Sequence, residues 1–339
     1  MKYKEILDNA RTHIGQFCKA CPECNGVACK NKMPGPGAKG IGMVAINNYN
    51  AWKDIYVVMD TIVENKKVDM SIDFFGQKIK YPFFAGPVGA VQVHYGKKYT
   101  DIEYNNILIS SCSNLDLLSF TGDGVYEDIM IGATSAIKKA NGFGVPTIKP
   151  WNLETIKQKV KLVEDSGAIA IAMDIDAAGL PHLQNMNPPS GSKTTQELKE
   201  IISLTETPFI VKGIMSVKGA LKAKEAGASA IVVSNHGGRV LDQCPPTALV
   251  LEEIVDAVNG NMKVYIDGGI RSGLDVFKAL ALGADGVLIC RPFVCSLYGG
   301  EKEGIELYMN KLANELEDTM KMCGAATINE ITRDMISRC

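Results

Sequence analysis

The chain has 339 residues, of which 46% are hydrophobic and 22% are charged, and its formal net charge is −2. A charge balance this close to neutral gives no basis for binding nucleic acid or a membrane surface, so neither is an expected partner. The sequence contains no apolar run of the length of a signal peptide or a membrane span, which predicts a soluble cytoplasmic protein.

The first 80 residues are predicted to form a leader, because they show no strand–helix unit before the strand that begins near residue 83. Four of the ten cysteines lie in this leader, at Cys18, Cys21, Cys24 and Cys29. The first three have the spacing of bacterial ferredoxin ligands, but the fourth comes one residue later and no proline follows it. Four thiolates could also bind structural zinc, and unligated cysteines are common in a reducing compartment. A [4Fe–4S] cluster, zinc and no metal therefore remain open.

Residues 81–339 are predicted to form a single α/β domain, to which the leader adds packing elements. Eight short apolar runs alternate with helical segments, and most of these runs are apolar throughout, as is typical of buried parallel strands. The predicted strands are Phe83–Gly89, Leu117–Thr121, Pro146–Pro150, Ile169–Ile175, Phe209–Ile214, Ala230–Asn235, Val264–Gly269 and Gly286–Arg291. Eight such units favour a (β/α)₈ TIM barrel. The alternative, a doubly wound sheet, would need a G-x-G-x-x-G turn after the first strand, and none is present.

Between the strands, helices are predicted at Lys218–Ala226, Leu249–Val258 and Gly273–Leu282, where apolar residues recur every three or four positions. Residues 176–195 are expected to form a long polar loop after the fourth strand. The chain is expected to end in a packing helix, Ala326–Arg338.

Charged side chains collect where the last four predicted strands end. Lys212 ends the fifth strand, Ser234-Asn235-His236-Gly237-Gly238-Arg239 the sixth, Asp267 through Arg271 the seventh and Arg291 the eighth. Because the C-terminal strand ends of a barrel meet at one face, these cations predict an anionic ligand. Asp267-Gly268-Gly269, followed by Arg271 and the start of a helix, has the composition of a phosphate-binding turn. An imidazole at His236 is suited to proton transfer near neutral pH.

Three stretches carry a resemblance to a known family. They are VSNHGGRVLD (233–242), IDGGIRSGLDVFKALALGAD (266–285) and ELEDTMKMCGA (315–325). They resemble the signatures of the FMN-dependent α-hydroxy-acid oxidase/dehydrogenase family, which includes glycolate and lactate oxidases. The resemblance implies an FMN-binding barrel, a small carboxylate substrate and a homo-oligomer.

The resemblance also implies roles for individual residues. His236 would be the catalytic base, Arg239 would bind the substrate carboxylate, Lys212 would lie against the N1/O2 edge of the flavin, and Asp174 would orient the histidine. The residues implied to bind FMN are Pro87, Val88, Gly89, Ser119, Lys149, Lys212, Ser234, Asp267, Gly268, Gly269, Ile270, Arg271 and Arg291.

The sequence departs from the family pattern at several of these positions. The second substrate arginine is expected two residues after Gly179, where Pro181 stands. Trp151 stands in place of a tyrosine, Lys149 in place of a glutamine and Cys290 in place of a glycine. Half of the carboxylate clamp is therefore missing, and His182 or another residue of the 176–195 loop is a candidate to replace it.

These observations predict an FMN-dependent oxidoreductase that oxidises a 2-hydroxy acid or a related substrate, with an unidentified electron acceptor. The principal alternative is an FMN/iron–sulfur reductase or electron-transfer dehydrogenase with an unrelated substrate. A type 2 isopentenyl-diphosphate isomerase and a flavin-binding protein without catalysis are further alternatives, and the His236–Arg239 pair disfavours the last.

Overall fold

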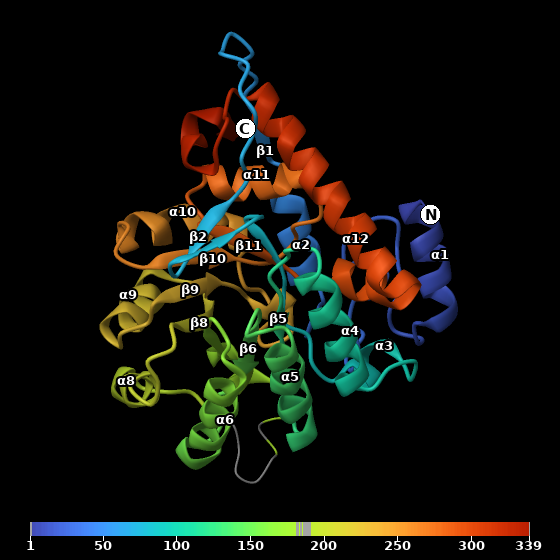
Figure 1. Cartoon of the computed structure of the whole chain (residues 1–339), viewed down its shortest axis with the longest axis vertical. Helices are drawn as coiled ribbons and strands as arrows, with labels where there is room; N and C mark the ends of the chain where they lie inside the picture. Colours follow the sequence, from blue (N-terminus) through green and yellow to red (C-terminus); the bar gives the residue numbers. More distant parts are fainter. Residues whose placement is uncertain (1, 181–182, 184, 186–190, 339) are drawn as a thin grey trace.

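Eight parallel strands form the central sheet of the protein. The computed structural model describes residues 2–180, 183, 185 and 191–338, and the strand order in this sheet is β4-β11-β10-β9-β8-β7-β6-β5. The strands are β4 (Phe83–Ala85), β5 (Phe120–Thr121), β6 (Val145–Ile148), β7 (Ile171–Asp174), β8 (Phe209–Ile214), β9 (Ala230–Val233), β10 (Lys263–Ile266) and β11 (Gly286–Ile289). A parallel bridge between Ala85 and Ser119 joins the two ends of the sheet. The predicted (β/α)₈ barrel is therefore confirmed (Figure 1).

Most of the strands end earlier than the sequence predicts. For example, β9 stops at Val233 instead of Asn235, and β10 stops at Ile266 instead of Gly269. The polar residues that follow belong to the loops at the C-terminal face, where backbone groups are not all used by the sheet. Ser234 and Asp267 are therefore the first residues of the barrel mouth.

Helices cover the outside of the barrel. They are α3 (Val91–Tyr95), α4 (Asp101–Ser113), α5 (Glu127–Lys139), α6 (Leu153–Ser166), α8 (Thr195–Ile202), α9 (Val217–Glu225), α10 (Thr247–Val258), α11 (Gly273–Ala281) and α12 (Arg291–Met322). Several start at side-chain caps, such as Thr194, which accepts from the backbone N–H of Glu197. The three helices predicted between strands are confirmed to within two residues at each end.

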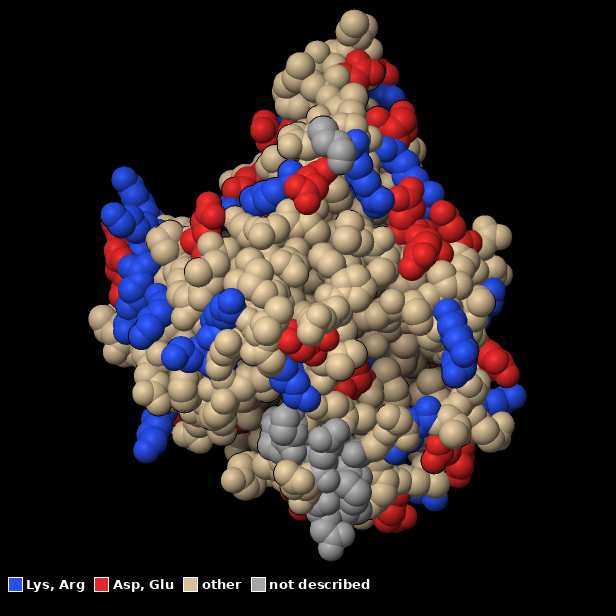
Figure 2. Space-filling model, turned by 180° about the vertical axis from the view of Figure 1, so that it is seen from behind, with Lys and Arg blue, Asp and Glu red and all other residues tan. Residues whose placement is uncertain are grey.

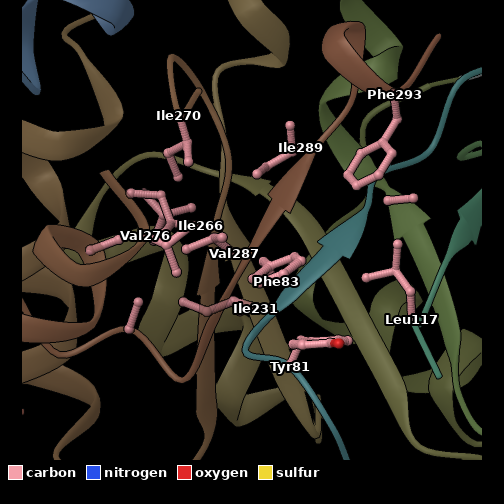
Figure 3. Packing of buried hydrophobic residues seen from close by; sticks show 14 of the residues in the cluster. Tyr81, Phe83, Leu117, Ile231, Ile266, Ile270, Val276, Val287, Ile289 and Phe293 are labelled. Atoms are coloured by element: carbon pink, nitrogen blue, oxygen red, sulfur yellow. The ribbon is translucent and has the colours of Figure 1, made fainter. Parts of the chain in front are cut away.

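Two hydrophobic cores stabilise this arrangement. One fills the barrel with side chains from its strands, and the β2 (Ile72–Phe74) and β3 (Gln77–Ile79) hairpin adds Phe74 and Ile79 to it. The Phe74 ring lies 5.6 Å from the rings of both Phe84 and Tyr265. The other core lies between the strands and the helices, and Figure 3 shows part of it around Phe83, Val287 and Phe293.

The leader contributes α1 (Tyr3–His13), α2 (Val44–Ala51) and β1 (Ile55–Val57). Helix α1 runs beside α12 at the edge of the barrel, as Figure 1 shows. Strand β1 pairs antiparallel with β12 (Ile336–Arg338) at the other end of the chain.

The predicted C-terminal helix, Ala326–Arg338, is wrong. This segment forms two short 3₁₀ turns, η3 (Ile328–Glu330) and η4 (Arg333–Met335), and then β12. Its pairing with β1 is a long-range contact that the local apolar spacing does not reveal.

Charge is mixed on the surface. Lysine and arginine side chains occur together with aspartate and glutamate over the face in Figure 2, and neither sign covers it. None of the described helices combines the length and apolar composition needed to cross a membrane.

Candidate active site at the barrel mouth

A buried network of opposite charges occupies the C-terminal ends of β6, β7 and β8. Lys149 Nζ lies 2.6 Å from Asp174 Oδ2, and Lys212 Nζ lies 3.1 Å from Asp174 Oδ1. Lys212 also lies 3.4 Å from Asp267 and donates to Ser234 Oγ at 3.2 Å. The structure thus brings together five predicted site residues: Lys149, Asp174, Lys212, Ser234 and Asp267.

The charges of this network support one another. Burial alone would raise the pKa of the Asp174 carboxyl, but the ammonium groups of Lys149 and Lys212 outweigh it and hold that pKa well below its usual range. Burial alone would likewise lower the pKa of Lys212, but Asp174 and Asp267 raise it well above its usual value. Lys212 is therefore fixed as a cation inside the mouth of the barrel.

The histidine has a different partner from the one predicted. His236 Nδ1 lies 3.1 Å from Asp176 Oδ1 and 3.2 Å from Asp176 Oδ2, so the residue that orients the imidazole is Asp176 and not Asp174. Asp174 is held by the two lysines instead. Asp176 comes two residues after Asp174, in the 3₁₀ turn η1 (Ile175–Gly179), and that turn carries it beyond the strand end. The Asp-Ile-Asp sequence at residues 174–176 was the signal that could have identified Asp176 as a second candidate.

His236 is held in an unusual backbone conformation. It begins the 3₁₀ turn η2 (His236–Gly238) with a φ of 54°, and its N–H donates to Ser234 Oγ at 3.2 Å. Residues other than glycine rarely adopt positive φ, and such positions concentrate at functional sites. A carboxylate that faces Nδ1 favours the tautomer that donates from Nδ1, and in that tautomer Nε2 presents its lone pair. No group in the described part of the chain hydrogen-bonds to Nε2.

Asp174, Asp176 and His236 are also close enough to be considered as metal ligands. They form the only set of three such side chains, within residues 2–180, 183, 185 and 191–338, whose ligand atoms lie within 4.8 Å of one another. Lys149 and Lys212 already neutralise Asp174, however, and a divalent cation would have to bind beside two buried ammonium groups. The chemistry of the set therefore favours proton transfer over metal binding.

Arg239 and Arg291 are the two arginines at the mouth that were predicted to bind anionic groups. Among the described residues no aspartate or glutamate forms an ion pair with Arg239 or Arg291. Arg239 instead donates to the carbonyl oxygens of Gly35 and Gly37 and lies 3.2 Å from His94 Nε2. Burial lowers the pKa of its guanidinium. Buried cations without carboxylate partners are typical of sites for anionic ligands.

The turn after β10 offers free backbone donors. The N–H groups of Gly268, Gly269 and Ile270 donate to no described acceptor, and both glycines have positive φ. The helix that follows is not free in this way, because Asp275 accepts from the N–H groups of Arg271 and Ser272. The predicted phosphate-binding turn therefore presents the amides of its loop and not those of the helix N-terminus.

Arg271 has a contact that the sequence did not predict. Its Nε donates to the carbonyl oxygen of Cys24 at 2.7 Å, so the cysteine segment of the leader lies against the predicted phosphate-binding turn. Arg271 also donates to the carbonyl oxygen of Ile270. Arg271 therefore connects the cysteine segment to this turn, whereas Arg291 makes one long hydrogen bond, to the carbonyl oxygen of Pro36 at 3.5 Å.

Helix α2 of the leader, with the residue that follows it, hydrogen-bonds to the loops after β9 and β10 at the barrel mouth. Asn48 and Asn235 exchange two hydrogen bonds of 2.8 and 2.9 Å, and Trp52 Nε1 donates to the carbonyl oxygen of Gly268 at 2.8 Å. A Cβ at position 269 would lie 2.2 Å from the backbone oxygen of Asn48, so only glycine fits there. Sequence analysis missed this role of the leader, because the contacts span about 200 residues.

The loops after β4, β5 and β6 form the opposite side of the mouth. Pro87, Val88 and Gly89 are half-buried, and Ser119 and Lys149 are buried. Trp151 Nε1 donates to Asp123 Oδ2 at 2.7 Å, and Lys159 Nζ donates to Asp123 Oδ1 at 2.8 Å. The indole N–H that replaces the expected tyrosine hydroxyl is therefore already bound to a residue that sequence analysis did not single out.

Cys290 stands where the family pattern has glycine, and its surroundings explain why it is tolerated. A Cβ at Gly86 would lie 2.6 Å from the Cys290 sulfur, so the glycine leaves room for the thiol. Burial raises the pKa of Cys290 to about 12. The thiol is therefore protonated at neutral pH and is not a nucleophile.

The four leader cysteines line one small cavity. Cys18, Cys21, Cys24 and Cys29 surround it together with Cys295 and Arg291 of α12. The Cys18 and Cys295 sulfurs lie 3.9 Å apart, and all nine described cysteines are free thiols. The predicted metal ligands are thus brought together, next to the arginine predicted to bind phosphate. Pro181 and His182, in contrast, lie outside the described residues.

Comparison with known proteins gives one family. The model of the FMN-dependent dehydrogenase family matches residues 36–187 and 181–338, so all four leader cysteines precede the matched region. A peroxisomal (S)-2-hydroxyacid oxidase of Arabidopsis thaliana is 32% identical over 323 residues, covering 85% of this chain and 86% of the relative. A 2-hydroxyacid oxidase of Dictyostelium discoideum is 32% identical over 317 residues, covering 85% and 81%.

Solved structures agree in fold. A variant of mandelate oxidase with a monooxide FMN adduct superposes with a TM-score of 0.75 at 27% identity, covering 90% of this chain and 94% of that one. A flavocytochrome b2 variant superposes with a TM-score of 0.77 at 25% identity, covering 89% of this chain and 80% of that one.

Proposed function

Because this chain belongs to the FMN-dependent dehydrogenase family, we propose that it oxidises a small 2-hydroxy acid to the 2-oxo acid, with His236 as the base. The observation that carries the proposal is the His236–Asp176 pair, which lies at a barrel mouth where Arg239 and Arg291 form no ion pair with any described aspartate or glutamate. The oxidation of a hydroxy carboxylate requires a base and a cation at one face, and here the base and the arginines lie at the same barrel mouth.

The residues at the mouth fit FMN. The free N–H groups of Gly268, Gly269 and Ile270, together with Arg291, would hold its phosphate. Lys212 and Lys149 would lie at the edge of the ring system where negative charge accumulates on reduction. The buried hydroxyls of Thr121 and Thr147, which have no protein partner among the described residues, are available at the ends of β5 and β6. When bound, FMN supplies an acceptor for the hydride that leaves the substrate carbon.

His236 would remove the proton of the substrate hydroxyl at Nε2. Asp176 keeps Nδ1 protonated and so leaves the Nε2 lone pair available for that proton. As the imidazole becomes cationic, the carboxylate 3.1 Å away stabilises it. The strained backbone at His236 fixes the ring relative to the turn, since its own N–H is bound to Ser234 Oγ.

Arg239 would bind the substrate carboxylate. Its guanidinium already contacts the Gly35 and Gly37 carbonyl oxygens and His94, so the carboxylate would bind beside the leader. A carboxylate would give this buried cation the negative partner that it lacks among the described residues. The leader segment 35–37 therefore shapes the substrate site in this proposal.

The deciding experiment is anaerobic mixing of the FMN-loaded protein with a panel of 2-hydroxy acids, including glycolate, lactate and mandelate. We expect at least one acid to bleach the visible flavin absorbance and to yield one 2-oxo acid per flavin. The matching methoxy acids keep the carboxylate but have no hydroxyl proton, and they should not bleach the flavin. Fully loaded protein that no 2-hydroxy acid reduces would contradict the proposal.

Other expectations remain predictions. We expect a cytoplasmic homo-oligomer, which fractionation and light scattering would check. The division into a leader of residues 1–80 and a barrel of residues 81–339 is likewise proposed. The electron acceptor would be identified by comparing reoxidation of the reduced flavin by oxygen, nicotinamide nucleotides and one-electron dyes.

A further inference from the structure

We propose that Cys18, Cys21, Cys24 and Cys29 bind a [4Fe–4S] cluster in the cavity that they line between the leader and α12. Their spacing along the chain is close to that of a ferredoxin motif, and folding brings all four to one cavity. Neither fact requires the other. Four cysteines with this spacing need not line one shared cavity, so their convergence is the second observation that supports a ligand.

The separation of the sulfurs distinguishes a cluster from a single zinc ion. Zinc with Zn–S bonds of about 2.3 Å would place its four sulfurs about 3.8 Å apart. In the described part of the chain, no three cysteine sulfurs lie within 4.8 Å of one another. A [4Fe–4S] cluster binds each thiolate through a different iron, so it spreads its ligands further apart. The geometry therefore fits a polynuclear cluster better than a mononuclear site.

The surroundings supply charge for an anionic cluster. Arg291 lines the cavity and has no carboxylate partner among the described residues. Arg11 of α1 donates to the carbonyl oxygens of Lys19 at 3.2 Å and Ala20 at 2.9 Å, which fixes the loop between the first two cysteines. Four thiolates and their inorganic core carry net negative charge, and buried negative charge requires such counter-charges.

The cavity is also tied to the barrel on two sides. Arg271 holds the backbone of Cys24 at 2.7 Å, and Cys295 lies one helical turn after Arg291 with its sulfur 3.9 Å from that of Cys18. Cys295 would therefore face a cluster ligand as a thiol neighbour. The proposed cluster would lie next to Arg291, which is also part of the proposed phosphate site, so the two cofactors would be neighbours.

The inference is independent of the proposed oxidation of 2-hydroxy acids, and its test reads metal content instead of turnover. Full-length protein is purified anaerobically, and iron, acid-labile sulfide, zinc and FMN are measured per chain. We expect about four iron and four sulfide. A low-temperature electron paramagnetic resonance signal should appear after reduction with dithionite.

Two variants make the test specific. The double variant Cys21→Ser/Cys24→Ser should lose iron and sulfide and keep FMN, which also reports that the barrel has folded. The control Cys323→Ala changes a buried cysteine at the far end of α12 and should keep the iron of the wild type.

Several outcomes would overturn the cluster. Wild-type protein with one zinc and no iron would do so, and so would FMN-loaded protein with neither metal, or iron that persists in the double variant. Iron and sulfide in a protein that no 2-hydroxy acid reduces would leave the cluster standing and would refute the proposed oxidation alone.

Discussion

The barrel rim and the leader meet at the same site, but they are built differently. The rim places charged side chains at or near successive strand ends: Lys212 lies in the last half of β8, and Asp267 directly follows β10. The leader contributes mostly backbone carbonyls and amide side chains, for example from Gly35, Cys24 and Asn48. The rim thus supplies the reactive groups, and the leader holds the loops that carry them.

Because of this difference, we expect substitutions in the two regions to have different effects on activity and stability. A substitution at the rim should slow the reaction and leave the free energy of unfolding unchanged, unless it breaks the buried charge network. A change in the leader should loosen the loops and so lower both stability and ligand affinity. The predictions below test this separation, starting with the largest expected effect.

Replacing the proposed base should produce the largest change. The His236→Asn variant should reduce its flavin about 10²- to 10⁴-fold more slowly, because proton removal by a positioned side chain is lost. The free energy of unfolding should change little, because asparagine tolerates the positive φ of this position and its amide can still donate to Asp176. Stopped-flow absorbance and urea unfolding would measure both. The control His13→Asn alters an exposed histidine of α1 and should react as the wild type does; a fast His236→Asn variant would remove the histidine from the mechanism.

At the rim, the substitutions expected to lower stability are those in the buried charge network of Lys149, Asp174 and Lys212. The Asp174→Asn variant leaves Lys149 buried without its carboxylate, which should cost about 3–5 kcal/mol at pH 7. Because the folded pKa of Asp174 is depressed, its contribution is present above about pH 4 and is lost as the pH falls. Urea unfolding should therefore show a gap between wild type and variant that narrows toward pH 3.

The exposed Asp165 of α6 offers a matched control for that network, and Asp165→Asn should stay within about 0.5 kcal/mol of wild type at each pH. A gap for Asp174→Asn that is the same at pH 7 and pH 3 would show that the carboxylate charge does not stabilise the rim.

Removing a leader contact should affect stability and ligand binding together. The Asn48→Ala variant loses the paired hydrogen bonds to Asn235 and should be less stable by about 2–4 kcal/mol. It should also bind FMN more weakly, because Asn48 packs under Gly268 and Gly269. Urea unfolding and fluorescence titration with FMN measure these effects. The neighbouring Asn47→Ala, at an exposed position, is the control; equal behaviour of the two variants would mean that the leader does not hold the turn.

The smallest effect is expected away from both regions. Thr194 caps α8, and Thr194→Ala should lower the free energy of unfolding by about 1 kcal/mol. Flavin reduction should be unchanged, because the cap bonds only to Glu197. A slower flavin reaction in this variant would show that stability and chemistry are not separable here.

The sequence predicted the barrel and much of its rim. The eight apolar runs were sufficient because buried parallel strands are apolar along their whole length, and this signal is local. The positions of Lys212, His236 and Asp267 followed from the rule that strand ends meet at one face. The resemblance to a family added the expected cofactor and the role of the base.

Other features were decided only by tertiary structure. The choice of Asp176 over Asp174 as the partner of His236 depends on a 3₁₀ turn that separates two adjacent carboxylates. The C-terminal strand depends on pairing with β1, about 280 residues earlier in the chain. The placement of Asn48 beneath the turn that follows β10 depends on hydrogen bonds across about 190 residues.

The physical reason is the range of the interactions. Hydrophobic periodicity and the residues at strand ends can be read from short stretches of the chain. The sequence by itself therefore determined the barrel, its mouth and the residue types that collect there. Which carboxylate meets which cation, and which leader residue covers which loop, depends on contacts between segments far apart in the chain. Buried polar groups must find partners wherever the packed chain offers them, and only the folded structure makes those partners neighbours.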